Sequence, residues 1–255
     1  MKSIARALFG GYFGLLNYLS NRKGIFVLMY HRVNDNLPAS EWVMSPEKFR
    51  EHMRYLKEYC DVIGMEELCA IFANQNGMLR HRRPQVVITI DDGYRDNFLN
   101  AYPILKEFKL PAIIFLATGL IGTNEKMQRY KDMPSPDMLS WDEVKEMSRN
   151  NITFGAHTVT HPHLPELDYS KQKEEIESSI KMLYDQLPQE LGRSIFCYPY
   201  GEYNSDTLKI MQELGIKIAF TVHEGINSPK VNPLELNRDG GDGQDGLVDF
   251  MRKFT

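Results

Sequence analysis

The sequence predicts an α/β protein with a parallel sheet covered by helices, either closed as a barrel or doubly wound. Short β-rich runs alternate along the chain with segments of helical apolar period, and this alternation is typical of parallel sheets. The runs are apolar throughout, as expected for strands that are buried on both faces. Six runs are predicted to be strands: residues 25–30, 86–90, 112–117, 152–155, 195–198 and 218–222.

The helices between these strands are predicted from caps and apolar stripes. Ser45 is followed by a proline, a pattern typical of a helix start, and Ser140 and Glu143 have the spacing of a reciprocal capping box. The helix after Ser140 is expected to run to Asn150. Apolar residues at helical spacing mark two further helices: Phe49, Met53 and Leu56 in the first, then Ile176, Ile180, Leu183 and Leu187 in the second.

Length and composition favour one ordinary globular domain over residues 25–255. The chain has 255 residues, of which 42% are hydrophobic and 25% charged, with a formal net charge of -4. This charge gives no field that would attract nucleic acid, and the short basic cluster at residues 80–83 is expected to be a solvated loop. Three cysteines without C-x-x-C spacing indicate neither a disulfide framework nor a cysteine-ligated zinc site.

Residues 1–24 form a separate N-terminal segment. Lys2 and Arg6 precede an apolar run at residues 7–19, but glycines interrupt the run and it lacks a signal-peptide cleavage site. It is also too short to span a bilayer. We expect an amphipathic helix that packs on the domain or contacts a membrane surface, and hence a cytoplasmic or membrane-associated protein without a cleavable signal peptide.

Two carboxylates follow the second predicted strand directly. Asp91 and Asp92 lie at its C-terminal end, where parallel α/β folds place their active sites. Adjacent aspartates repel each other when both are ionised, and binding of a cation by one of them relieves the cost while the other serves as a base. The alternative is a turn in which an aspartate caps the next helix and Gly93 supplies a permissive backbone.

Histidines cluster after the fourth predicted strand. His157 and His161 are four residues apart, a spacing compatible with chelation of one metal ion, and a nearby carboxylate would complete a two-His-one-carboxylate set. His163 leaves the assignment open, because His161 and His163 would share a face of an extended loop. Taken alone, the turn at residues 196–201 and the histidine at the end of the first strand, His31, have structural interpretations.

Taken together, these segments resemble the polysaccharide deacetylase (NodB-homology) family from residue 25 to about residue 238. Residues 89–94, TIDDGY, are similar to the family's T-F-D-D-G-Y motif, and residues 157–161, HTVTH, fit its H-[ST]-x-x-H motif. The resemblance implies a distorted, incomplete (β/α) barrel forming a single catalytic domain. It also implies that Asp91 is the catalytic base and that Asp92, His157 and His161 are the metal ligands.

Two departures from the family pattern concern the remaining site residues. Residues 198–201, YPYG, are similar to the family's R-x-P-Y-G motif, so Tyr200 is expected to offer its backbone N–H to the oxyanion, but Cys197 replaces the arginine. The C-terminal L-x-H motif is also missing. The LMYH sequence at residues 28–31 resembles the circularly permuted poly-N-acetylglucosamine deacetylase branch, which implies His31 as the general acid. Arg238 is a candidate partner of Asp91, and His223 is the alternative acid.

The resemblance implies a carbohydrate N-deacetylase that acts on an N-acetylated glycan and releases acetate. One divalent ion is expected, zinc first, with cobalt, nickel or iron as alternatives. A catalytically impaired carbohydrate-binding or assembly protein and an O-acetyl esterase are the alternative functions. The polar segment at residues 122–136 is expected to lie over the mouth of the site, and the sequence names neither the sugar nor the oligomeric state.

Overall fold

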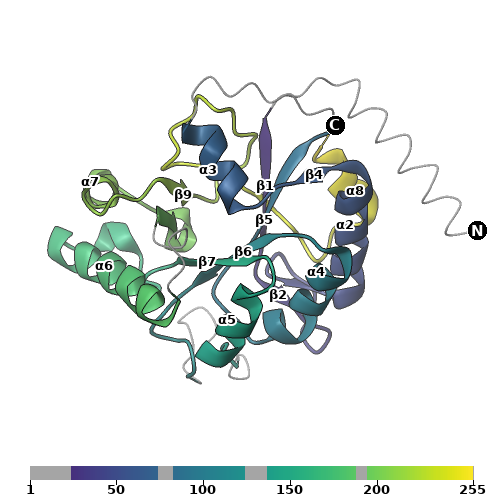
Figure 1. Cartoon of the computed structure of the whole chain (residues 1–255), viewed down its shortest axis with the longest axis horizontal. Helices are drawn as coiled ribbons and strands as arrows, with labels where there is room; N and C mark the ends of the chain where they lie inside the picture. The colour runs from purple at the N-terminus through teal and green to yellow at the C-terminus, as the bar shows by residue number, and fades with distance from the viewer. Residues whose placement is uncertain (1–23, 74–82, 124–136, 188–193, 255) are drawn as a thin grey trace, which may run out of the picture.

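A computed structural model describes residues 24–73, 83–123, 137–187 and 194–254 (Figure 1). Three sequence-based predictions therefore lie outside the described residues: the N-terminal segment except Gly24, the core of the basic cluster at 80–82, and nearly all of the segment predicted to cover the site. Among the described helices, none is long and apolar enough to cross a membrane.

All six predicted strands are present, with four further strands of two residues each. The strands are β1 (Ile25–Tyr30), β2 (Arg32–Val33), β3 (Val43–Met44), β4 (Asp61–Val62), β5 (Gln85–Ile90), β6 (Ala112–Leu116), β7 (Ile152–Ala156), β8 (Ile195–Cys197), β9 (Ile218–Phe220) and β10 (Asp239–Gly240). A two-residue strand has no apolar period of its own, so β2, β3, β4 and β10 could not be predicted from periodicity.

The main sheet is parallel throughout and follows the order β10-β1-β5-β6-β7-β8-β9, with β4 also paired to β5. The longest pairing joins β1 to β5 over six residues, from Ile25 opposite Gln85 to Tyr30 opposite Ile90. Strands β2 and β3 form a separate small parallel sheet. The sheet is strongly curved, so the C-terminal ends of its strands converge (Figure 1).

The segment from Pro233 to Gly240 lies between β9 and β1 and contains β10. Ala219 of β9 donates its backbone N–H to Pro233 and accepts from Leu236, and Thr221 donates to Leu236. The same segment then becomes β10 and pairs with β1. Because β9 and β10 are not paired within the described sheet, the fold is an incomplete barrel whose gap is bridged by this closing segment, residues 233–240.

The inside of the curve is filled by side chains from strands on opposite sides. Phe115 of β6 and Phe220 of β9 have ring centroids 5.3 Å apart although two strands separate them in the sheet, so they meet across the interior. Met65 and Leu68 of α3 (Met65–Ala73) belong to the same buried cluster. The interior is therefore a packed core, and polar groups lie only at its ends.

The other helices cover the outside of the sheet (Figure 1). They are α2 (Pro46–Tyr59), α4 (Tyr102–Phe108), α5 (Trp141–Ser148), α6 (Tyr169–Gln186), α7 (Ser205–Glu213) and α8 (Leu247–Arg252), with a π-helical turn η1 (Asn97–Ala101) and 3-10 turns η3 (Leu164–Glu166) and η5 (Pro199–Gly201). The predicted capping box is formed: Ser140 Oγ accepts from the N–H of Glu143, whose carboxylate accepts from the N–H of Ser140. Helix α5 ends at Ser148, two residues before the predicted end.

Candidate active site

Polar side chains from widely separated parts of the chain meet at the C-terminal ends of the parallel strands. Asp91 follows β5, His157 follows β7, and His31 follows β1, while Arg238 precedes β10 in the closing segment. All four side chains are buried. A buried polar cluster of this kind adds nothing to an apolar core. Its position at the strand ends therefore indicates a functional site.

Asp92, His157 and His161 form a compact group of potential metal ligands. Asp92 Oδ1 lies 3.6 Å from His157 Nε2 and 3.5 Å from His161 Nε2. The ligand atoms of the three residues all lie within 4.8 Å of one another. Donors that are each about 2.1 Å from a tetrahedral zinc ion lie about 3.4 Å apart, so these residues fit one divalent ion.

A hydrogen bond at Nδ1, on the side of the ring away from Asp92, fixes the orientation of His157. Its Nδ1 lies 2.7 Å from the backbone carbonyl oxygen of Cys197, so Nδ1 carries an N–H and Nε2 faces Asp92. Burial disfavours charge on this ring, but Cys197, Asp92 and Asp91 outweigh burial and raise the pKa of His157 to about 10. A divalent cation between these groups would replace that proton.

The chain around the ligand group adopts strained backbone conformations. Among the described residues, six non-glycine residues have positive φ, and four of them belong to the site: Asp92 at 77°, Thr158 at 65°, His161 at 61° and Tyr200 at 57°. Left-handed conformations are unfavourable for such residues and persist where the surroundings determine them. Their concentration here indicates that the backbone is shaped to aim these groups.

Helix α6 holds the loop between the two ligand histidines. The Glu175 carboxylate accepts hydrogen bonds from the backbone N–H groups of Val159 and Thr160, at 2.8 and 3.0 Å, and from the Thr160 hydroxyl. Ser179 donates to the carbonyl of Thr158. These bonds satisfy the polar groups of an irregular segment and anchor it to a rigid element.

Asp91 pairs with Arg238. Both carboxylate oxygens accept from the guanidinium, at 2.8 and 2.7 Å, and both side chains are buried. Arg238 is itself held by the backbone carbonyl of Thr221 at 2.7 Å and by Thr89 Oγ1 at 3.1 Å. Burial alone would raise the pKa of Asp91, but the bidentate pair with Arg238 holds the pKa below its usual value. The carboxylate is therefore ionised.

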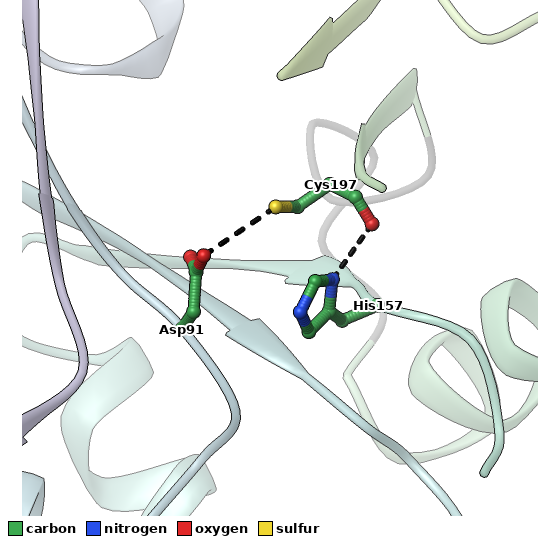
Figure 2. Close-up of side chains that lie close together, drawn as sticks. All are labelled: Asp91, His157 and Cys197. Carbon is green, nitrogen blue, oxygen red and sulfur yellow. Dashed lines mark hydrogen bonds between the residues drawn. The ribbon is translucent and has the colours of Figure 1, made fainter. Parts of the chain in front are cut away.

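Cys197 contacts both Asp91 and His157 (Figure 2). Its Sγ is 3.6 Å from Asp91 Oδ2 and 3.0 Å from a guanidinium nitrogen of Arg238. Asp91, His157 and Cys197 form a second group whose ligand atoms are close together. The Arg238 cation already neutralises this second group, and like charge repels a metal ion there, so the Asp92 group is the better cation site.

The two histidines considered as general acids have different surroundings. His31 is buried, with its Nε2 3.9 Å from Asp91 Oδ2 and its ring against the edge of Trp42 at 4.5 Å. His223 is exposed to solvent. The structure therefore brings His31 beside Asp91, while the role of either residue stays a prediction.

His163 lies away from the ligand group. Its ring stacks on Tyr200 with centroids 3.9 Å apart, and its Nδ1 lies 2.7 Å from the Glu202 carboxylate. The expectation that His161 and His163 share a face fails because His161 has a positive φ, which turns the chain between them. Sequence reasoning also missed Glu202, whose position next to the YPYG turn gave no signal of this contact.

Comparisons with known proteins identify a family and a fold for the chain. The sequence model of the family described as polysaccharide deacetylase matches residues 79–219. A poly-beta-1,6-N-acetyl-D-glucosamine N-deacetylase of Staphylococcus aureus is 26% identical over 232 residues, 88% of this chain and 76% of its own.

Two solved structures share the fold over most of their length. The deacetylase PplD of Streptococcus pyogenes, in complex with acetate, is 27% identical with a TM-score of 0.77, over 91% of this chain and 99% of its own. IcaB from Ammonifex degensii is 25% identical with a TM-score of 0.72, over 84% and 90%. With more than half of its residues matched by the family model, the chain belongs to the polysaccharide deacetylase family.

Proposed function

We propose that this protein is a metal-dependent N-deacetylase that removes acetyl groups from N-acetylated sugars of a poly- or oligosaccharide and releases acetate. The observation that carries the proposal is the buried group of Asp92, His157 and His161 with the ionised Asp91 directly beside it. The named activity of the Staphylococcus aureus relative and the acetate bound by the Streptococcus pyogenes structure support the substrate class.

The ligand set suits one divalent ion, with zinc as the first choice and cobalt, nickel or iron as alternatives. Asp92, His157 and His161 would hold the ion, and the ion would supply Lewis-acid activation of water and of the acetyl carbonyl. The hydrogen bond from His157 Nδ1 to the Cys197 carbonyl orients the ring so that Nε2 faces Asp92 and could bind the ion in place of its proton.

The neighbouring residues supply the proton transfers. Asp91, kept ionised by Arg238, takes a proton from the water that attacks the carbonyl carbon. His31 lies on the same side as Asp91 and, when protonated, gives a proton to the sugar nitrogen as the C–N bond breaks. The products are acetate and a free amino sugar.

Tyr200 completes the site through its backbone. Its left-handed conformation, with φ 57° and ψ 7°, follows directly from the end of β8 and turns the peptide at the mouth of the site. We assign its N–H to the developing oxyanion, because a preorganised backbone donor at this point stabilises charge that appears only in the transition state.

The test is acetate release from N-acetylglucosamine oligomers by the zinc-loaded protein, with metal content measured in parallel. Asp91→Asn should retain zinc and lose about 10²-fold or more in kcat, because it removes the base and leaves the ligands. His157→Ala should lose both zinc and activity.

Three outcomes would contradict the proposal or one of its residue roles. Full activity of Asp91→Asn would exclude Asp91 as the base. A wild-type protein that binds zinc but releases acetate only from O-acetylated sugars would be an esterase, and one that binds the oligomers without releasing acetate from either substrate would be a carbohydrate-binding protein.

A further inference from the structure

Three aromatic rings form a row at the rim of the site. The edge of the His161 ring contacts Tyr200, with centroids 4.6 Å apart and planes at 74°. His163 also contacts Tyr200, and its ring is parallel to the Tyr200 ring within 5° at 3.9 Å. The Tyr200 ring therefore contacts both a proposed metal ligand and a histidine that is outside the ligand group.

The backbone that carries this ring is strained. Tyr200 and Gly201 both have positive φ, at 57° and 71°, in consecutive positions. A left-handed conformation costs a residue with a side chain roughly 1–2 kcal/mol. No other residue fits in place of Gly201, because a Cβ at this position would lie 2.7 Å from the backbone nitrogen of Val222. Backbone hydrogen bonds from Gly201 to Tyr198 and from Glu202 to Pro199 close this turn, and the contacts of the Tyr200 ring add a further restraint on its conformation.

His163 is locked in place by Glu202. The Nδ1–Oε2 distance is 2.7 Å, and the two side chains are 43% and 46% exposed. Exposed ion pairs of this kind add little to stability, about 0–1 kcal/mol. What the pair does provide is a fixed ring plane for His163, parallel to that of Tyr200.

We propose that His163 and Glu202 are positioning residues that clamp the Tyr200 ring and so fix the direction of the Tyr200 backbone N–H. Neither residue touches the reacting atoms. Only the effect of the clamp on catalysis rests on the proposed function. The conformation of Tyr200 itself can be measured in the protein without substrate or metal.

The catalytic test compares His163→Ala with His163→Phe, which keeps an aromatic face for Tyr200. His163→Ala should lower kcat about 10-fold, less than the loss of a whole oxyanion donor, while KM and zinc content stay unchanged. His163→Phe should recover most of the loss, and Glu202→Gln should lie between the wild type and His163→Ala. Lys173→Ala on α6, which removes the Lys173–Glu213 ion pair of similar exposure, is the matched control.

A second measurement is independent of catalysis. In metal-free protein, the three-bond HN–Hα coupling of Tyr200, which reports its φ, should change in His163→Ala and stay near its wild-type value in His163→Phe. An unchanged Tyr200 coupling in His163→Ala would overturn the clamp, whatever the protein catalyses. A kcat loss that His163→Phe does not restore, or one that follows zinc loss, would also overturn it.

If the wild-type protein released no acetate while the Tyr200 coupling changed in His163→Ala as expected, the proposed function would fail and the clamp would stand.

Discussion

The ionisation of Asp91 depends on an arginine that lies 147 residues further along the chain. In the family motif an arginine precedes the YPYG-like turn, whereas here Cys197 holds that position and Arg238 reaches the carboxylate from the closing segment. The small thiol leaves space for the guanidinium. A positive charge beside the proposed base is thus present although its position in the sequence differs.

Loss of this charge should be visible in the pH dependence of the reaction. In Arg238→Met the buried Asp91 loses its counter-charge, so the pKa of Asp91 should rise and the acid limb of kcat/KM should move to higher pH. Activity at neutral pH should fall while zinc is retained. The measurement is a pH–rate profile, with Arg252→Met on the surface as the control.

An unmoved acid limb would show that Arg238 does not set the ionisation of the base.

At this scale the sequence predicted residues that belong to short motifs. Asp91 and Asp92 follow a strand directly, and the spacing of His157 and His161 allows a shared ion, so local sequence marked each pair, whereas the parallel strands β5, β6 and β7 bring the two pairs together. Local sequence was not sufficient for His163, because the left-handed turn at His161 reverses the direction that spacing predicts. The roles of these residues stay predictions until activity and metal binding are measured.

Secondary-structure elements were predictable where caps or long apolar runs mark them. The capping box at Ser140 and the start of α2 after Ser45 appear as expected because each depends on contacts within four residues. Helices α3, α4, α7 and α8 were not predicted, since they have at most nine residues and lack the Ser-x-x-Glu capping box that marked the equally short α5. The packing between elements depends on residues that are distant in sequence.

Helix α2 carries a buried histidine that makes stability depend on pH. His52 stacks on Phe250 of α8 at 3.6 Å and lies 3.2 Å from the Tyr30 hydroxyl. Burial, with Lys48 and Lys253 nearby, lowers the pKa of His52 to about 3. The folded state therefore binds fewer protons than the unfolded state between pH 6.5 and 3, and stability present above pH 6.5 is lost as the pH falls.

The expected loss at pH 5 is about 2 kcal/mol of unfolding free energy from this one group. Denaturant unfolding at pH 7 and pH 5 measures it, and His52→Gln, which has no titrating ring but keeps an acceptor for Tyr30, should show a smaller loss. If the variant and the wild type lost equal unfolding free energy between pH 7 and pH 5, other titrating groups would be responsible for the pH dependence.

For the molecule as a whole, strand–helix alternation left a closed barrel and a doubly wound sheet as equal alternatives. A closed barrel and a doubly wound sheet have the same local pattern of strands and helices. They differ in whether the two end strands of the sheet meet. Here they are bridged by residues 233–240, in which only β10 is a strand and which no periodicity marks. The family resemblance, rather than the pattern of elements, predicted the incomplete barrel.

The bridge should contribute strongly to stability. Leu236 is fully buried in the interior cluster and exchanges backbone hydrogen bonds with β9. Leu236→Ala should cost roughly 2–5 kcal/mol of unfolding free energy, because it leaves a cavity. Leu99→Ala, at a residue 56% exposed, should change stability by no more than about 0.5 kcal/mol.

Equal effects of the two substitutions in thermal or denaturant unfolding would mean that the closing segment adds little to the core.

Because one stretch of chain both bridges the sheet ends and carries Arg238, assembly and chemistry are completed in the same step. During synthesis His157 and His161, the proposed metal ligands, leave the ribosome some 80 residues before the guanidinium that pairs with Asp91 does, at a rate of about 5–20 residues per second. A nascent chain would therefore hold its ligands before it holds an active base, and would remain inert until its last strand had docked.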